Sequence, residues 1–424
     1  MTAPTMESTV AALLAPGKGI LAADESLPTI GKRFKARNIP STAENRRTYR
    51  ELLFTTPGLG DFISGVILFD ETIRQKIGGA PAAAALAGQA IVPGIKVDLG
   101  TAALPGFAGE KFTQGLDGLR ERLAGYRELG ARFTKWRAVI AIGEHLPSAS
   151  CVETNARTLA LFAALSQEAG LVPIVEPEVL MDGDHDLARC EEVTHATLLR
   201  VFAALADHRV ALETMLLKTG MVLPGKDCSS QAGPGDVAEA TLRCLRRTVP
   251  AAVPGIVFLS GGQSDVAATE RLNAICQTGG APWKLSFSFG RALQDAAMKT
   301  WAGVPANLVA AQTALLHRAR CNSLAVQGKY SARTEREATT RDEDFYRDRG
   351  TLPASAHSNK SMKTTESSDR RGTVRPAKKA PGSQSPLVSS PAEAKRESAR
   401  LRRGRASLES APTTAETDIR SSLI

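Results

Sequence analysis

Eight short apolar runs, spaced at intervals of about 30–45 residues, constrain the fold of this sequence more than any other feature. Most of the runs are continuous rather than alternating in polarity, as expected of parallel strands buried on both faces. They lie at 19–23, 63–69, 91–97, 133–142, 171–175, 211–217, 255–259 and 283–289. Helical patterns lie between them, for example at 116–129, 155–169, 187–206, 236–247 and 265–276. Strands alternating with helices predict right-handed βαβ units, and eight units predict an α/β fold, the (β/α)8 TIM barrel.

The chain divides by composition into three parts. Residues 1–16 precede the first run and are expected to form an N-terminal arm, and residues 17–350 hold the barrel. Residues 351–424 are rich in Ser, Thr, Ala, Arg, Lys and Pro with few large apolar side chains, so we predict a disordered C-terminal extension. This tail holds 14 Lys and Arg against 7 Asp and Glu, which is +7 of the total net charge of +9. The barrel is therefore not a basic, nucleic-acid-binding domain.

Several classes of protein are disfavoured by simple patterns. No apolar run reaches the ~18–20 residues of a membrane span, and the N-terminus has no signal or transit pattern. The six cysteines form no CxxC pair, which favours reduced thiols in a cytoplasmic enzyme. The six histidines form no HxxxH or HxH pair, which disfavours a zinc-dependent carbon–carbon lyase. The acidic stretch 182–186 has the wrong spacing for a calcium loop, so no metal site is expected.

Charged and small polar residues stand at the carboxyl ends of the eight runs. In a barrel these positions converge on one face, where barrel active sites lie. Structural ion pairs would explain one or two such charges. They would not explain why six strands each place a charged group at this open end of the barrel, which we call the mouth. In chain order they are Asp24, Glu25 and Ser26, then Asp70 and Glu71, Lys96 and Asp98, Lys135 and Arg137, Glu176 and Glu178, Lys218, Ser260 to Gly262, and Ser288 to Arg291.

Lys218 directly follows the buried run Met215–Leu217 and is the candidate nucleophile. Burying an ammonium lowers its pKa, and a nearby second cation lowers it further. A free amine near neutral pH attacks a carbonyl carbon readily. The structural alternative is a lysine that extends from a strand end to solvent.

Two carboxylates suit proton transfer at this mouth. Glu176 follows an apolar run, so we expect partial desolvation to raise its pKa into a useful range. Asp24 lies at a neighbouring mouth position and would orient the amine or take a hydroxyl proton. Either residue alone would also fit an ion-pair partner.

The last two run ends predict a phosphate site. LSGG (Ser260, Gly261, Gly262) and SFGR (Ser288, Gly290, Arg291) each offer small residues and backbone N–H groups ahead of a helix. Barrel enzymes commonly bind phosphate at the loops after strands seven and eight. The mouth is predicted to hold further cations, which are Lys96, Lys135, Arg137 and the pair Lys32-Arg33. Their charge would be balanced by Asp24, Glu176, Glu178 and an anionic ligand. For that pair, a solvated helix face is the alternative.

Taken together, these residues resemble the class I (Schiff-base) fructose-1,6-bisphosphate aldolases from about Gly17 to Tyr330. The stretches that carry the resemblance include GKGILAADES, GVILFDET, FTKWRAVIAIGEH, VPIVEPEVL, LLKTGMVLPG, GIVFLSGGQS, FSFGRALQ and NSLAVQGKY. The resemblance implies a TIM barrel and a metal-independent, cofactor-free glycolytic aldolase. It also implies a cytoplasmic homotetramer that reversibly cleaves fructose 1,6-bisphosphate to dihydroxyacetone phosphate and glyceraldehyde 3-phosphate.

The resemblance also implies roles for individual residues. Lys218 would form the imine with the ketose C2, Glu176 would be the acid/base glutamate, Asp24 would take the C4 hydroxyl proton, and Lys135 would be the second active-site lysine. Positions matching phosphate-binding or sugar-binding residues are Ser26, Thr29, Arg33, Lys96, Arg137, Glu178, Ser260, Gly261, Gly262, Ser288, Gly290 and Arg291.

The sequence departs from the family at two places, and alternatives stay open. Thr219-Gly220 follows the lysine where many members have Pro-Asn, and the family's C-terminal tyrosine is missing, with Tyr346 as the candidate substitute. One alternative is a Schiff-base aldolase for another phosphorylated sugar. Others are a binding role for the basic tail, towards RNA, membrane or acidic proteins, and a catalytically inactive scaffold.

Overall fold

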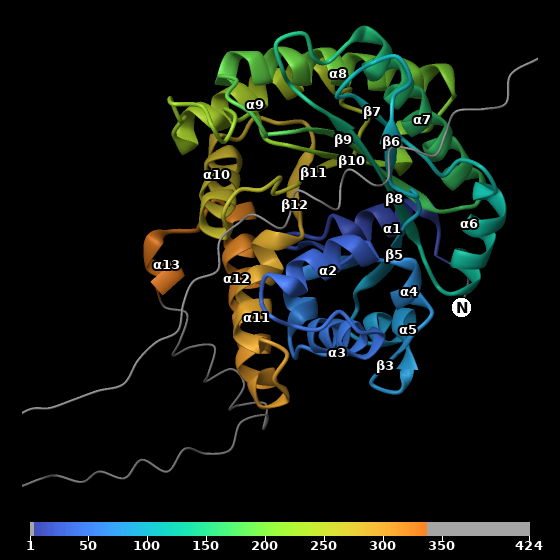
Figure 1. The fold of residues 1–424 in the computed structure, drawn as a ribbon, viewed down its shortest axis with the longest axis vertical. Helices are drawn as coiled ribbons and strands as arrows, with labels where there is room; N and C mark the ends of the chain where they lie inside the picture. The colour runs from blue at the N-terminus through green and yellow to red at the C-terminus, as the bar shows by residue number, and fades with distance from the viewer. Residues whose placement is uncertain (1–3, 337–424) are drawn as a thin grey trace, which may run out of the picture. The chain divides into compact units, whose positions relative to one another are not determined.

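The computed structural model describes residues 4–336, and eight parallel strands within them form one closed barrel (Figure 1). This confirms the predicted TIM barrel. Each strand pairs with the next barrel strand along the chain, and β12 pairs back with β1. The strands are β1 (Gly19–Ala22), β2 (Ile63–Leu68), β5 (Val92–Lys96), β8 (Phe133–Ile140), β9 (Val172–Val179), β10 (Leu216–Thr219), β11 (Gly255–Phe258) and β12 (Lys284–Phe289).

Helices follow the strands and surround the barrel (Figure 1). Several begin at a polar cap: the side chains of Thr42, Ser148, Asp186 and Ser264 each accept a hydrogen bond from the backbone N–H three residues on. The longer helices are α2 (Leu27–Lys35), α3 (Ala43–Phe54), α6 (Leu119–Glu128), α7 (Ala149–Glu168), α8 (Leu187–Asp207), α9 (Pro234–Thr248), α10 (Asp265–Thr278), α11 (Arg291–Trp301) and α12 (Leu308–Val326). The shorter ones are α4 (Asp70–Ile73), α5 (Ala82–Ala87) and α13 (Ala332–Arg336).

The barrel interior holds its own apolar cluster, separate from the larger one between strands and helices. Successive side chains of a strand point to opposite faces, so every second residue faces inward. Ile20, Phe133, Ile174 and Leu216 form part of the interior cluster, whereas their neighbours Leu21, Val175 and Leu217 belong to the outer one. This alternation also fixes which residues face inward at the mouth.

The segment expected to be an N-terminal arm packs into the barrel. Its helix α1 (Met6–Leu13) brings Val10, Leu13 and Leu14 into the interior cluster. Glycines make room for them, since a Cβ at Gly255 would lie 2.5 Å from Leu14 Cδ2. Helix α1 therefore closes the end of the barrel opposite the mouth.

Two strands differ from their predicted bounds in a way that affects the site. β9 continues through Val179, so Glu176 and Glu178 lie inside a strand rather than after it. The predicted run 211–217 instead begins with a 3-10 turn, η2 (Leu212–Thr214), and β10 includes Lys218. The sequence patterns also missed two small hairpins, β3 (Lys76–Ile77) with β4 (Ala80–Pro81) and β6 (Thr101–Ala103) with β7 (Lys111–Thr113).

Part of what the sequence predicts lies outside the described residues. The tail 351–424 and Tyr346 fall there, as does the end of the barrel domain as predicted to residue 350. Among residues 4–336, no helix has the length and apolar character needed to cross a membrane.

Candidate active site

Strand alternation brings the predicted catalytic side chains together inside the barrel mouth. Lys218 lies two residues after Leu216, which faces the barrel interior, so it faces inward one layer higher. Glu176 stands in the same relation to Ile174, and Lys135 to Phe133. The mouth layer is thus the continuation of an apolar interior, which explains why its charges are buried.

Four of these residues form one set of ion pairs, which we call the buried charge cluster: Asp24, Lys135, Glu176 and Lys218. The Nζ of Lys218 lies 3.0 Å from Oε1 of Glu176, and the Nζ of Lys135 lies 3.2 Å from Oε2 of the same carboxylate. Lys135 also lies 2.7 Å from Oδ2 of Asp24. Side-chain exposure is 4% for both lysines and for Glu176, and 12% for Asp24. Each carboxylate is therefore neutralised by at least one lysine in near-complete isolation from water.

The pKa values of the cluster follow from these pairs. Burial opposes the charged form of Asp24, but Lys135 and Lys218 outweigh it and lower the pKa of Asp24 to about 2. Burial likewise opposes ionisation of Glu176, yet Lys135, Lys218 and Arg137 lower the pKa of Glu176 below its ordinary value. The prediction of a raised pKa at Glu176 is therefore wrong. Burial lowers the pKa of Lys135, but Asp24 and Glu176 outweigh it and raise it, so Lys135 stays a cation.

Two further cations of the mouth, Lys96 and Arg137, each form an ion pair with a nearby carboxylate. Lys96 Nζ lies 2.6 Å from Oδ1 of Asp98. Arg137 on β8 forms an ion pair with Glu178 on β9. The predicted site residues Lys96, Arg137 and Glu178 thus border the buried charge cluster, with Asp98 as an additional partner.

The two predicted phosphate loops lie side by side. Gly261 and Gly262 have positive φ values of 55° and 102°, and a Cβ at Gly262 would lie 3.3 Å from Nη2 of Arg291. Gly290 precedes α11, so Arg291 is the first residue of that helix. The Oγ of Ser288 is buried and has no hydrogen-bond partner in the described part of the chain. Ser260 comes two residues after β11. This edge of the mouth therefore offers backbone N–H groups, a guanidinium and an unpaired hydroxyl to an anion.

The predicted site residues that follow β1 lie in or just before helix α2 rather than in a phosphate loop. Ser26 is the residue before α2, and its Oγ lies 3.0 Å from Oγ1 of Thr29. Arg33 is partly buried and binds Asp295 of α11 at 2.7 Å, next to the phosphate loops. Its neighbour Lys32 is exposed, so the solvated-face alternative holds for Lys32 only.

Glu25 was predicted to lie at the mouth, but no role was assigned to it. Its two carboxylate oxygens bind Arg33 and Arg50, and the Nη2 of Arg50 lies 2.6 Å from Oε2. The signal was present, because Glu25 stands between Asp24 and Ser26 in the first loop. It fixes the orientation of Arg33 rather than facing the buried charge cluster.

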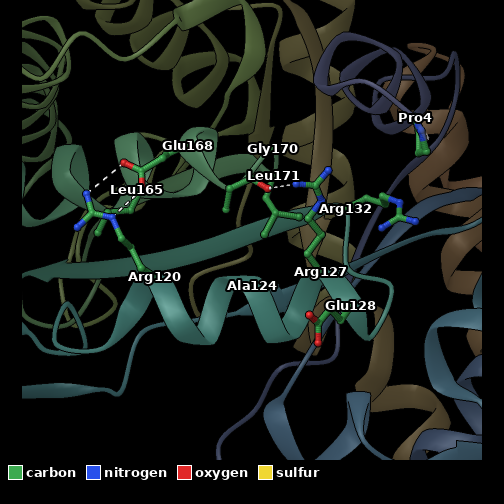
Figure 2. Close-up of a pocket in the computed structure, with 11 residues that line it drawn as sticks. Pro4, Arg120, Ala124, Arg127, Glu128, Arg132, Leu165, Glu168, Gly170 and Leu171 are labelled. Atoms are coloured by element: carbon green, nitrogen blue, oxygen red, sulfur yellow. Dashed lines mark hydrogen bonds and ion pairs between the residues drawn. The ribbon is translucent and has the colours of Figure 1, made fainter. Parts of the chain in front are cut away.

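A surface hollow of about 590 Å³ lies at the other end of the barrel (Figure 2). Arg132 and Leu171, which line it, come just before β8 and β9. Arg120 in this hollow is paired with Glu168 at 2.6 Å, and Arg127 donates to the carbonyl of Ala169 at 3.0 Å. The hollow has no part in the arrangement at the mouth.

The departure after Lys218 is accommodated inside the strand. Thr219 is buried, ends β10 and pairs with Phe258 of β11. Its carbonyl accepts a hydrogen bond of 2.9 Å from the N–H of Leu259. The residue after Lys218 is therefore tied to the neighbouring strand.

Comparison with known proteins agrees with this geometry. The family model for class-I fructose-bisphosphate aldolase matches residues 5–350. A probable fructose-bisphosphate aldolase class 1 of Xanthomonas campestris pv. campestris is 56% identical over 332 residues, covering 78% of this chain and 99% of that protein. The fructose-bisphosphate aldolase of Dictyostelium discoideum is 53% identical over 328 residues, covering 76% of this chain and 92% of that one.

A solved structure gives the same result. It is a fructose-bisphosphate aldolase from Plasmodium falciparum in complex with TRAP and a small-molecule inhibitor, which superimposes with a TM-score of 0.76 at 49% identity. The match covers 77% of this chain and 95% of that one. With strand order, sequence and site chemistry in agreement, the chain belongs to the class-I fructose-bisphosphate aldolase family.

Proposed function

We propose that this chain reversibly cleaves fructose 1,6-bisphosphate to dihydroxyacetone phosphate and glyceraldehyde 3-phosphate through a Schiff base on Lys218. The observation that carries the residue assignment is the buried charge cluster, in which two lysines and two carboxylates meet inside the barrel mouth. Family membership supports the reaction. The cluster supports the choice of residues.

The first step is condensation of the amine with the ketone. Lys218 gives up a proton, and its nitrogen lone pair attacks C2 of the open-chain sugar. Glu176, whose Oε1 lies 3.0 Å from the Lys218 Nζ, is placed to accept that proton. The same carboxyl then returns a proton to the C2 hydroxyl, which leaves as water and gives the protonated imine.

The second step is cleavage of the C3–C4 bond. A base removes the proton of the C4 hydroxyl, the C4–O bond becomes a carbonyl, and the C3–C4 electron pair moves into the imine to give an enamine. Asp24 is suited to this role because Lys135 keeps it ionised, with a pKa of about 2. Protonation of the enamine at C3 and hydrolysis of the imine then release dihydroxyacetone phosphate.

The phosphates of the substrate are assigned to the edge of the mouth. Arg291, the backbone around Gly261 and Gly262, and the unpaired hydroxyl of Ser288 form one anion site. Arg33, held by Asp295 beside it, and Lys96 and Arg137 on the opposite strands add positive charge. Such a distribution suits a ligand with a phosphate at each end.

Trapping the covalent intermediate tests the assignment. The full chain is incubated with dihydroxyacetone phosphate and borohydride, with EDTA present, and digested for mass spectrometry. Lys218→Arg is compared with Lys226→Arg, whose lysine is half-exposed and paired with Asp182 outside the mouth. We expect an adduct on Lys218 in wild type and Lys226→Arg. In Lys218→Arg we expect no adduct and a loss of cleavage by at least about three orders of magnitude.

An adduct on another lysine, or full cleavage by Lys218→Arg, would refute the role of Lys218. Substrate choice is measured separately, by comparing turnover of fructose 1,6-bisphosphate and fructose 1-phosphate. Faster turnover of the monophosphate would assign the chain to another phosphorylated sugar.

We also propose that the protein is a cytoplasmic homo-oligomer, with a tetramer expected from the family resemblance. All six cysteines are unpaired thiols, as in a reducing compartment. Leu161 on α7 and Leu199 on α8, which are 40% and 46% exposed, are candidates for an apolar contact between copies. Sedimentation analysis checks the assembly, and a monomer at micromolar concentration would overturn it.

A further inference from the structure

A second cluster of reactive side chains lies outside the barrel, between the last two described helices. His317 and Cys321 are one helical turn apart on α12, so both face the same side, and Glu335 comes from α13 (orange in Figure 1). The Nε2 of His317 lies 3.4 Å from Sγ of Cys321 and 3.8 Å from Oε1 of Glu335. All three ligand atoms lie within 4.8 Å of one another. None of these residues takes part in the aldolase chemistry.

From this geometry we propose that His317, Cys321 and Glu335 bind a Zn²⁺ ion. Zinc bonds of ~2.3 Å to sulfur and ~2.0–2.1 Å to nitrogen or oxygen at tetrahedral angles place ligand atoms roughly 3.3–3.6 Å apart. The observed 3.4 Å between Nε2 of His317 and Sγ of Cys321 lies in this range, and the 3.8 Å between Nε2 and Oε1 of Glu335 would shorten by a few tenths of an ångström. A thiolate and an imidazole favour zinc over magnesium or calcium. Three protein ligands leave the fourth position to water.

The surroundings hold Glu335 in the orientation that a ligand needs. The Tyr330 hydroxyl donates to Oε2 of Glu335 at 2.7 Å, and Arg318 donates to Oε1. Ligating carboxylates are commonly fixed by such outer hydrogen bonds. Because a carboxylate oxygen has two lone pairs, Oε1 can accept from Arg318 and bind a metal at the same time.

The positive charge of Arg318 opposes a second cation, so the charge balance has to be considered. Arg318 also donates to Thr269 at 2.6 Å and to the carbonyl of Asp265 at 3.1 Å, and these bonds keep it in place. The carboxylate of Glu335, which accepts hydrogen bonds from Arg318 and Tyr330, supplies one negative charge. On binding, the Cys321 thiol releases its proton to solvent, and this adds the second negative charge.

The metal would add an attachment between α13 and α12. Helix α13 has five residues, and none of them is buried. The carboxylate of Glu335 contacts His317 and Arg318 of α12. A zinc ion shared by the two helices would fix α13 against α12 and stabilise the folded protein by mass action.

The test uses the full chain, stripped of metal by a chelator and titrated with Zn²⁺ and, as a spectroscopic probe, Co²⁺. We expect one high-affinity equivalent, a thiolate-to-cobalt charge-transfer band, and a rise in Tm with Zn²⁺. Cys321→Ser should lose the band, and His317→Ala should lose the Tm shift. Cys228→Ser, which removes the partly exposed thiol of another loop, is the matched control and should behave as wild type. Tyr330→Phe should weaken Zn²⁺ binding by about 10- to 100-fold through the outer contact alone.

Every variant is first checked for undiminished aldolase activity, which shows that the barrel is intact. A wild-type protein that binds no Zn²⁺ tightly overturns the proposal. So does a cobalt band that survives in Cys321→Ser or disappears in Cys228→Ser. If Cys321→Ser fails to fold, Glu335→Gln is used instead, because the carboxylate of Glu335 is only half-buried and its loss leaves the core closed. Undiminished Zn²⁺ affinity in Glu335→Gln would then overturn the proposal.

Discussion

The Nζ of Lys135 lies 2.7 Å from Oδ2 of Asp24, and both side chains are almost completely withdrawn from water. The same ammonium lies 3.2 Å from Oε2 of Glu176. Two carboxylates at such close quarters would repel each other and one would take up a proton, unless a cation stood between them. Lys135 is that cation, and it allows Asp24 and Glu176 to be ionised together.

We therefore predict that Lys135→Met lowers cleavage by about 100-fold or more and moves the acid limb of the pH–rate profile to higher pH. Without Lys135, the pKa values of Asp24 and Glu176 rise, because burial then outweighs the remaining cations. The loss of a positioned base costs about 10²–10⁴ in rate. Steady-state kinetics between pH 5 and 9 measures both effects.

Lys284→Met is the control, because Lys284 is exposed at the start of β12 and faces no carboxylate of the buried charge cluster. Its profile should match that of wild type. An unchanged acid limb in Lys135→Met would mean that Lys135 does not set the ionisation of these acids.

A second prediction concerns stability in acid. The pKa of Asp24 is lowered from an ordinary value of 3.8 to about 2, so folding favours its ionised form. This stabilisation, about 2 kcal/mol, is nearly complete above about pH 5 and is lost as the pH falls through 4 towards 2. Asp24→Asn should therefore be less stable than wild type by about this amount at pH 6, and the gap should narrow between pH 4 and 3.

Denaturant unfolding of wild type and Asp24→Asn at pH 6, 4 and 3 measures the difference in their unfolding free energies. Titrating groups that lie away from the buried charge cluster are common to the two proteins, so their contributions cancel in the difference. A gap that stays constant down to pH 3 would show that the ionisation of Asp24 is not coupled to folding.

Two serines on one strand allow binding and stability to be separated. Ser288 Oγ is buried at the mouth without a partner, whereas Ser286 Oγ donates to the carbonyl of Lys18 at 2.6 Å, further from the mouth. Ser288→Ala should leave stability unchanged or slightly higher, because no hydrogen bond is lost. It should raise the KM for fructose 1,6-bisphosphate several-fold, since a phosphate loses a donor.

Ser286→Ala removes the same hydroxyl group, but it should lower stability and leave substrate binding unchanged. Losing its hydrogen bond should cost about 1 kcal/mol of unfolding free energy and leave KM unchanged. Thermal unfolding measures the stability of both variants, and steady-state kinetics measures their KM for fructose 1,6-bisphosphate. If Ser288→Ala binds substrate as well as wild type does, Ser288 is not a phosphate ligand.

Much of the barrel could be predicted because its signals are local. A continuous apolar run marks each buried strand, and the polar residue at its end marks the mouth, as for Lys218 after Leu217. The position of Glu176 within the mouth followed in the same way. The roles of these residues rest on family resemblance and on the proposals above, which the experiments test.

What the sequence could not predict depends on contacts between distant segments. The pKa of Glu176 was expected to rise, because the local sequence shows only an apolar run before it. It falls because Lys135 and Lys218, on the two neighbouring strands, meet its two oxygens. Packing of the first helix into the barrel was missed for the same reason, since small residues such as Gly255 create its space far away in the sequence.

The last prediction tests whether the two phosphate loops act as one site. Gly262 has a φ of 102°, and a Cβ there would meet Arg291 Nη2 at 3.3 Å and Met181 Sδ at 3.4 Å. Gly262→Ala should strain the loop and displace the guanidinium of Arg291. We expect KM for fructose 1,6-bisphosphate to rise roughly tenfold, with a smaller change in kcat, because binding rather than bond cleavage is disturbed. Gly235→Ala is the matched control, since Gly235 lies in the first turn of α9 and a Cβ there has no neighbour within 4 Å. It should leave both constants unchanged, and an equal rise in KM in the two variants would contradict a joint phosphate site at Gly262 and Arg291.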